Sequence, residues 1–165
     1  MKIFVILHNI RSLHNVGAIF RTAEGLGASK IYLIGYTPEP YDFFGKLRMD
    51  FAKTALGAEK YIKWEKVKNI FSLIKQLKQD GVQILALEQS KNAIDIKKFS
   101  LGLGHRVSKL GIALILGNEV SGVPKSVLKK CDKIIQIPMR GKKESLNVSV
   151  AAGIALYALI TRLRN

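Results

Sequence analysis

Short apolar runs that recur between helical patterns constrain the fold of this chain more than any other feature. They occupy residues 3–7, 30–34, 82–87, 112–116 and 134–137, and most of them lack the alternation of a half-exposed strand. Strands buried on both faces have this character, because helices cover both sides of a parallel sheet. The sequence therefore predicts an α/β fold, with a mostly parallel sheet and helices on both faces.

Apolar residues at helical spacing fill the segments between these strands. The first such segment has Val16, Ile19 and Phe20 on one face, with Asn15 as the expected N-cap and Gly27 just past the end. Further helices are expected over 50–56, 67–78, 125–130 and 146–163, a short strand over 61–64, an irregular loop over 37–44 and a polar segment over 95–109. With 165 residues and no internal repeat or linker, we expect one domain.

The net charge restricts the class of binding partner. The chain has 27 Lys and Arg against 12 Asp and Glu, a formal charge of +15. Such an excess favours a polyanion, which could be RNA, DNA or an anionic membrane. A lysine-rich composition that raises every surface charge is the alternative explanation. Charge alone therefore indicates a partner class and no chemistry.

Other counts exclude several classes of protein. Cys131 is the only cysteine, so an internal disulfide and a CxxC metal site are excluded, and the three histidines lack zinc-ligand spacing. The apolar run at the start is too short for a signal peptide, and the longest one, 148–160, is too short to cross a bilayer. We therefore expect a cytoplasmic protein with no metal and no membrane contact.

Nucleotide-binding and hydrolase fingerprints are also missing. A dinucleotide-binding fold needs glycines directly after its first strand, where this chain has 8–11, His-Asn-Ile-Arg. The Gly-Leu-Gly sequences at 25–27 and 102–104 lack the third glycine in register, and there is no Walker lysine motif and no G-x-S-x-G elbow. A common cofactor-binding or hydrolytic function is therefore not indicated.

Three stretches are more polar than packing alone requires, namely 9–23, 116–124 and 137–152. In the first, Arg11, Asn15 and Arg21 gather around an expected helix start, which is a natural place for an anion. A capped helix, a tight turn and a loop before a helix would each explain one stretch without any function.

Taken together, the three stretches resemble the three motifs of the SpoU/TrmH branch of the SPOUT RNA methyltransferases. Asn15 begins N-x-x-x-x-x-R-T-A, Leu116 begins L-G-N-E-x-x-G, and Ile137 begins I-P-M-x-G-x-x-x-S-L-N-V-S-V-A. Their order and spacing match those of the family, the likeness covers nearly the whole chain, and the third motif is the most specific.

The resemblance implies a C-terminal trefoil knot whose loops bind S-adenosylmethionine, which leaves as S-adenosylhomocysteine. Gly117, Ile137 and Leu146 match the family's cofactor-contacting positions. The remaining candidates for cofactor contact are Leu116, Met139 and Gly141 in the same loops, and Leu87 and Glu88 at the end of a strand. An apolar slot with backbone donors and acceptors suits an adenine ring.

The resemblance also implies catalytic roles in methyl transfer to a ribose 2′-hydroxyl. Arg21 matches the residue at the hydroxyl, Asn15 orients its surroundings, and Glu119 holds the arginine and the loop. Ser145 and Asn147 are expected to secure substrate or cofactor. Because a guanidinium does not lose its proton in proteins, we expect Arg21 to stabilise the developing alkoxide, with the proton acceptor left open.

A homodimer and an RNA substrate complete the expectation. The family completes its site across two copies, and the small and aliphatic residues of 151–160 would serve that contact, although they would equally suit a core. RNA phosphate would be bound by basic residues, namely Arg11, Lys46, Arg48, Lys53, Arg140, Lys142 and Lys143. Without an appended RNA-binding domain, transfer RNA is the first expectation and ribosomal RNA the second. A non-catalytic RNA-binding or assembly protein and a SPOUT base methyltransferase are the alternatives.

Overall fold

The computed structural model describes residues 1–100 and 111–164. Within these ranges the chain forms a seven-stranded sheet in the order β3-β2-β1-β6-β4-β7-β5, and every strand pair is parallel. The strands are β1 (Lys2–His8), β2 (Lys30–Ile34), β3 (Trp64–Val67), β4 (Val82–Leu87), β5 (Ile94–Asp95), β6 (Gly111–Leu116) and β7 (Lys133–Gln136). The predicted α/β class is confirmed, and the sheet is parallel throughout.

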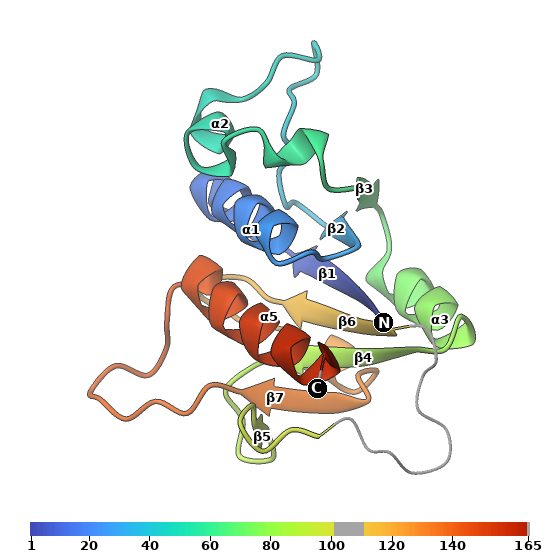
Figure 1. Ribbon diagram of the computed structural model, residues 1–165, viewed down its shortest axis with the longest axis vertical. Coiled ribbons are helices and arrows are strands. Elements are labelled where there is room, and N and C mark those ends of the chain that lie inside the picture. The colour runs from blue at the N-terminus through green and yellow to red at the C-terminus, as the bar shows by residue number, and fades with distance from the viewer. Residues whose placement is uncertain (101–110, 165) are drawn as a thin grey trace.

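Helices cover both faces of this sheet (Figure 1). They are α1 (Leu13–Gly25), α2 (Met49–Ala55), α3 (Ile70–Gln79), α4 (Lys125–Leu128) and α5 (Val148–Arg164), with a 3-10 turn at Ala58–Lys60. The first, second and last of these helices lie on one face, while α3 and α4 lie on the other. The chain therefore has three layers, as the apolar strand runs predicted.

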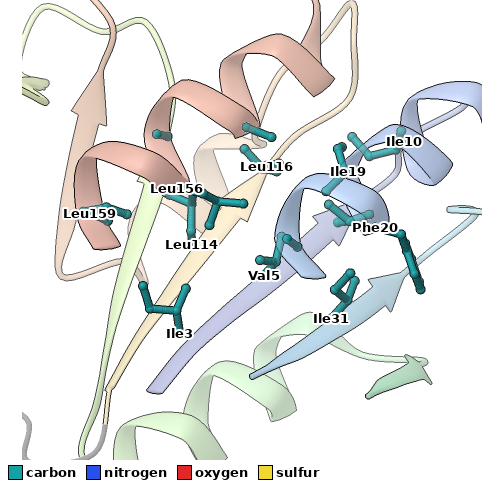
Figure 2. Packing of buried hydrophobic residues seen from close by; sticks show 14 of the residues in the cluster. Ile3, Val5, Ile10, Ile19, Phe20, Ile31, Leu114, Leu116, Leu156 and Leu159 are labelled. Carbon is teal, nitrogen blue, oxygen red and sulfur yellow. The ribbon is translucent and has the colours of Figure 1, made fainter. Parts of the chain in front are cut away.

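The central strands β1 and β6 are buried on both faces. Figure 2 shows Val5 and Leu114 beneath α1 and α5, where Phe20 and Leu156 are fully buried. The next residue of β1, Ile6, points to the opposite face and packs in the cluster that α3 contributes to. Burial on both faces explains why these strands lack alternation of apolar and polar residues.

Two local predictions were wrong, and one short strand was not predicted. Ser12, not Asn15, caps α1, because its Oγ accepts the Asn15 backbone N–H at 3.3 Å. The strand expected over 61–64 begins at Trp64, where pairing with Ile31 starts. The two-residue strand β5 was not predicted, and only its second residue, Asp95, belongs to the segment 95–109 that was expected to be polar, of which residues 101–109 lie outside the described ranges.

Parallel strands place all their carboxyl ends at one edge of the sheet. The segments that leave β4, β6 and β7 therefore meet there, and they are 88–93, 117–124 and 137–147. Figure 1 shows the long loop 137–147 extending past the arrowheads of β6 and β7. Two of the three motif segments thus lie at the edge where open α/β sheets usually bind ligands.

Candidate functional site

A cavity of about 220 Å³ opens at the carboxyl ends of β4, β6 and β7. Most of the predicted cofactor-contacting residues line it, namely Leu87, Glu88, Leu116, Gly117, Ile137 and Leu146. Met139 and Gly141 belong to the same loop as Ile137 but are not in the lining. The structure therefore gathers six of the eight predicted residues around one cavity.

The turn that follows β6 forms one wall of this cavity. Asn118 and Gly122 exchange backbone hydrogen bonds of 3.2 and 2.9 Å, and Asn118 Oδ1 accepts the N–H groups of Val120 and Ser121 at 2.9 Å each. A Cβ on Gly117 would lie 2.3 Å from the carbonyl carbon of Gly122, so only glycine fits there. The turn is therefore fixed by Asn118 from inside and by the absent side chain of Gly117.

Residues at the end of β4 connect this turn to the start of the loop 137–147. Glu88 Oε2 accepts the Val123 N–H at 2.7 Å, and Gln89 Nε2 donates to the Ile137 carbonyl at 2.8 Å. Gly122, at a φ of +67°, leaves room for the Glu88 carboxylate, which a Cβ would approach to 2.2 Å. Glu88 and Gln89 therefore hold the cavity walls together.

Glu119 binds the start of α1. Its Oε2 accepts the Arg11 N–H at 3.0 Å, and its Oε1 accepts the Ser12 N–H at 3.0 Å and Asn15 Nδ2 at 3.1 Å. Partial burial by itself raises the pKa of Glu119, but these donors outweigh it and hold the pKa below its ordinary value. Glu119 is therefore a carboxylate at neutral pH, with its negative charge placed at a helix start.

Asn15 and Asn147 extend this contact to the third motif. Asn147 Nδ2 donates to Asn15 Oδ1 at 3.1 Å, while Asn147 Oδ1 accepts both the backbone N–H and the hydroxyl of Ser149, at 2.8 and 2.7 Å. A continuous chain of hydrogen bonds thus runs from Glu119 through Asn15 and Asn147 to Ser149. The three motif segments meet at this chain, although Asn15 in the first lies 104 residues from Glu119 and 132 residues from Asn147.

Arg21 lies elsewhere in the same copy of the chain. It is exposed on α1 and lines a shallow depression between α1, α2 and α5, together with Lys53 and Tyr157. Within residues 1–100 and 111–164 it forms no ion pair, and the expected contact with Glu119 is not made, because backbone donors and Asn15 occupy that carboxylate. Sequence reasoning placed Arg21 beside Glu119, and the single chain does not.

Ser145 lines the cavity, on a loop whose polar groups are free. Among the described residues, none at 138–146 makes a hydrogen bond or an ion pair. Of this range, Ser145 and Leu146 line the cavity, whose walls are apolar at Leu87, Leu116 and Ile137. This combination fits S-adenosylmethionine, whose adenine needs an apolar slot and whose polar edges need hydrogen-bond partners.

Six of the seven predicted RNA-binding residues fall into two exposed groups, and Arg11 lies apart from both. Arg140, Lys142 and Lys143 lie on the loop beside the cavity, while Lys46 and Arg48 precede α2 and Lys53 lies within it. Lys53 pairs with Asp50 at 3.1 Å, and the backbone of Arg11 is held by Glu119. In the part of the chain that the structure describes, no cluster of potential metal ligands is present, and no helix is long and apolar enough to cross a membrane.

Sequence reasoning assigned no role to Asn118 or Gln89. Asn118 was within a quoted motif, and its Nδ2 also donates to the Asn9 carbonyl and to Tyr36 Oη, at 2.9 Å each. An asparagine two residues after a strand, followed by a glycine four residues later, is a signal of such a self-bonded turn. Gln89 carried no comparable signal, because its partner is a backbone carbonyl 48 residues away.

Comparison with known proteins gives consistent relationships. Residues 2–157 match the sequence pattern of the SpoU rRNA Methylase family. YacO of Bacillus subtilis strain 168, named as a TrmH family tRNA/rRNA methyltransferase, is 32% identical over 98% of this chain and 59% of its own. A tRNA (guanosine(18)-2′-O)-methyltransferase of Aquifex aeolicus is 34% identical over 94% of this chain and 67% of its own.

Solved structures share the fold. The AdoMet-bound rRNA methyltransferase from Sinorhizobium meliloti matches with a TM-score of 0.83 and 26% identity, over 98% of this chain and 57% of its own. The chain thus spans about 60% of the length of several of these proteins.

Proposed function

The chain belongs to the SpoU rRNA Methylase family, and from this premise we propose that it is an S-adenosylmethionine-dependent RNA methyltransferase acting on a ribose 2′-hydroxyl. The observation that carries the proposal is the hydrogen-bond chain from Glu119 through Asn15 to Asn147, which joins all three motifs beside the cavity. The printed name of the Aquifex relative specifies 2′-O transfer, and the Sinorhizobium structure holds AdoMet.

The cavity residues would hold the cofactor in distinct ways. Leu87, Leu116 and Ile137 would contact the adenine ring, and the backbone groups of Ser145 and Leu146 would bind its polar edges. When bound, S-adenosylmethionine supplies an electrophilic methyl group on its sulfonium. We retain the trefoil knot, which the family resemblance implies, as part of the proposal. Because α4 and α5 lie on opposite faces of the sheet, the chain crosses this edge between β7 and α5.

Two side chains have separable roles in this proposal. Arg21 remains a cation and stabilises the alkoxide that develops on the ribose oxygen. Glu119 stays ionised and fixes the start of α1, so that Asn15 faces Asn147. A carboxylate engaged by three donors is a poor proton acceptor, so we assign Glu119 to positioning.

The separation of Arg21 from the cavity supports a homodimer. Val150, Ile154 and Tyr157 are 51, 42 and 62% exposed and lie at helical spacing on one face of α5. Exposed apolar residues on one helix face are typical of a contact surface. We propose that a second copy packs here and brings its Arg21 to the cavity of the first.

Transfer RNA is the proposed first substrate and ribosomal RNA the second, in the cytoplasm, which suits a chain with one cysteine. The exposed lysines and arginines beside the cavity would bind phosphates, so RNA affinity should fall steeply with salt.

The test is incubation with methyl-labelled S-adenosylmethionine and unmodified transfer and ribosomal RNA, followed by nuclease digestion and mass spectrometry of the nucleosides. Label in a 2′-O-methylnucleoside supports the proposal and identifies the RNA. A methylated base would instead indicate a base methyltransferase. Cofactor binding and dimerisation without transfer to either RNA would favour a non-catalytic RNA-binding protein.

A further inference from the structure

The loop between β2 and α2 displays two aromatic side chains in solvent. Phe43 is 96% exposed and Phe44 is 90% exposed, the highest values among the exposed large hydrophobic side chains of the described residues. Their ring centroids lie 5.6 Å apart at an interplanar angle of 85°. Exposed phenyl rings lose the free energy that burial would provide, so a pair of them at one tip indicates a contact made with another molecule.

The tip is a built turn. Asp42 Oδ1 accepts the N–H groups of Phe44 and Lys46 at 2.9 Å each, and Asp42 N–H donates to the Lys46 carbonyl at 2.9 Å. Gly45 takes a φ of +76°, which closes the turn. Phe43 and Phe44 therefore occupy the corner positions, where side chains point away from the chain.

The base of the loop is anchored to the body of the protein. Tyr41 pairs with Leu47 across the loop and its ring stacks on Trp64 at a centroid distance of 6.4 Å. Arg48 N–H donates to the Pro40 carbonyl at 2.9 Å. The two phenyl rings are thus presented on a fixed support, so little conformational freedom is lost when they bind.

The charge around the tip selects the kind of partner. Lys46 and Arg48 are exposed within five residues of both phenyl rings, and the carboxylate of Asp42 is occupied inside the turn. Exposed aromatic rings with flanking cations are the combination that binds unpaired nucleotides, because rings stack on bases while cations bind phosphates. A partly exposed apolar partner protein would not require the cations.

We propose that Phe43 and Phe44 form a stacking platform for unpaired bases of the RNA substrate, a proposal that rests on the RNA methyltransferase function above. The loop projects beyond α2, away from the loop 137–147 that borders the cavity (Figure 1). The platform therefore binds bases other than the nucleotide in the cavity of its own copy. It recognises an RNA by the presence of unpaired bases at a set position.

The test compares Phe43→Ala/Phe44→Ala with Phe71→Ala, a matched control on α3 whose phenyl is 42% exposed on the opposite face. Binding of a fluorescent single-stranded RNA oligonucleotide and of a duplex of equal length is measured over a range of salt. We expect the double variant to lose about tenfold or more in single-strand affinity, since stacking is worth about 1–3 kcal/mol per base. Duplex affinity and the control should be unchanged.

The dependence on salt separates stacking from charge. The double variant keeps every cation, so its plot of log affinity against log salt should run parallel to that of the native protein, whereas Lys46→Ala should have a shallower slope. Phe43→Trp/Phe44→Trp should bind single-stranded RNA about as well as the native protein does. Phe43→Leu/Phe44→Leu should bind it as weakly as the double alanine variant does, because stacking needs aromatic faces.

Other outcomes would overturn the platform. The platform is refuted if the double variant and the control bind single-stranded RNA equally well, or if the leucine variant binds it as the native protein does. It is also refuted if the native protein does not bind single-stranded RNA, or if the double variant changes only the oligomeric state. Methyl-transfer assays on the same proteins separate the two proposals. Phenylalanine-dependent RNA binding with no methyl transfer by the native protein would retain the platform and refute the enzymatic function, while transfer unaffected by the double variant, with unchanged binding, would do the reverse.

Discussion

Glu119 connects the start of α1 to the turn after β6 through three donors, and its pKa is lowered by them. Because the folded-state pKa lies below the unfolded value of about 4.3, the carboxylate stabilises the fold above that pH. The contribution is lost as the pH falls through the folded pKa. In Glu119→Gln, one amide NH₂ would face backbone donors, so we expect a loss of about 1 kcal/mol at pH 7.

Chemical unfolding of the native protein and of Glu119→Gln between pH 7 and pH 3 measures this loss of stability. The difference in unfolding free energy should be largest near neutrality and should shrink in acid. Glu144→Gln is the control, because Glu144 is exposed and forms no ion pair within the described residues. A difference that is constant with pH would show that the charge of Glu119 contributes nothing.

Arg21 tests whether charge or geometry dominates at the ribose oxygen. Its guanidinium is exposed in the single chain, so substitution should leave the unfolding free energy nearly unchanged. Arg21→Lys keeps a cation and should retain measurable methyl transfer, whereas Arg21→Ala should lose nearly all of it. Steady-state kinetics with the same RNA provides the comparison. Equal and complete inactivation of both variants would contradict a mainly electrostatic role.

Among the helices and strands, the turn between β6 and α4 determines the shape of the cavity. In Gly117→Ala, the new Cβ would meet backbone atoms of Gly122 and Val123 at 2.3 and 2.4 Å, which no side-chain rotation relieves. Overpacking of this kind costs about 1–3 kcal/mol of folding stability. Relieving the clash displaces the turn that lines the cavity, so cofactor affinity should also fall, by about tenfold. Isothermal titration with S-adenosylmethionine measures it.

Gly25→Ala is the matched control for this change. Gly25 is the last residue of α1, and a Cβ there would have open space around it. Alanine should be neutral or slightly stabilising at that position. If both variants bind the cofactor as the native protein does, the cavity is not the cofactor site.

The helices and strands also show which parts of the fold can be predicted from sequence patterns. Central strands could be predicted because burial on both faces leaves an unbroken apolar run, as in 82–87. Edge strands could not be predicted in this way, because two of the four residues of β3, Glu65 and Lys66, are charged, and β5 has only two residues. Asn15 was mistaken for the cap because its real partners, Glu119 and Asn147, lie more than 100 residues away.

The motifs predicted which residues meet, since Glu119, Asn15 and Asn147 share one hydrogen-bond chain. They did not predict that Arg21 would stand apart from these residues, because sequence order carries no information about a second copy. The separation is evidence on assembly: if Arg21 acts on a substrate in the cavity, it must come from the other chain. This argument does not depend on the exposed apolar face of α5.

Mixing Arg21→Ala with Gly117→Ala, assayed at a cofactor concentration too low for Gly117→Ala to bind it, tests this arrangement directly. Arg21→Ala keeps an intact cavity, and Gly117→Ala keeps an intact arginine. In a mixed dimer, the cavity of the first chain would receive the arginine of the second, which restores one site of two. Random exchange of equal amounts makes half of the dimers mixed, so methyl transfer should recover to about a quarter of the native rate. If each site used its own arginine, no mixture would be active. Exchange itself is verified with differently tagged chains, and absence of recovery after verified exchange would show that each copy works alone.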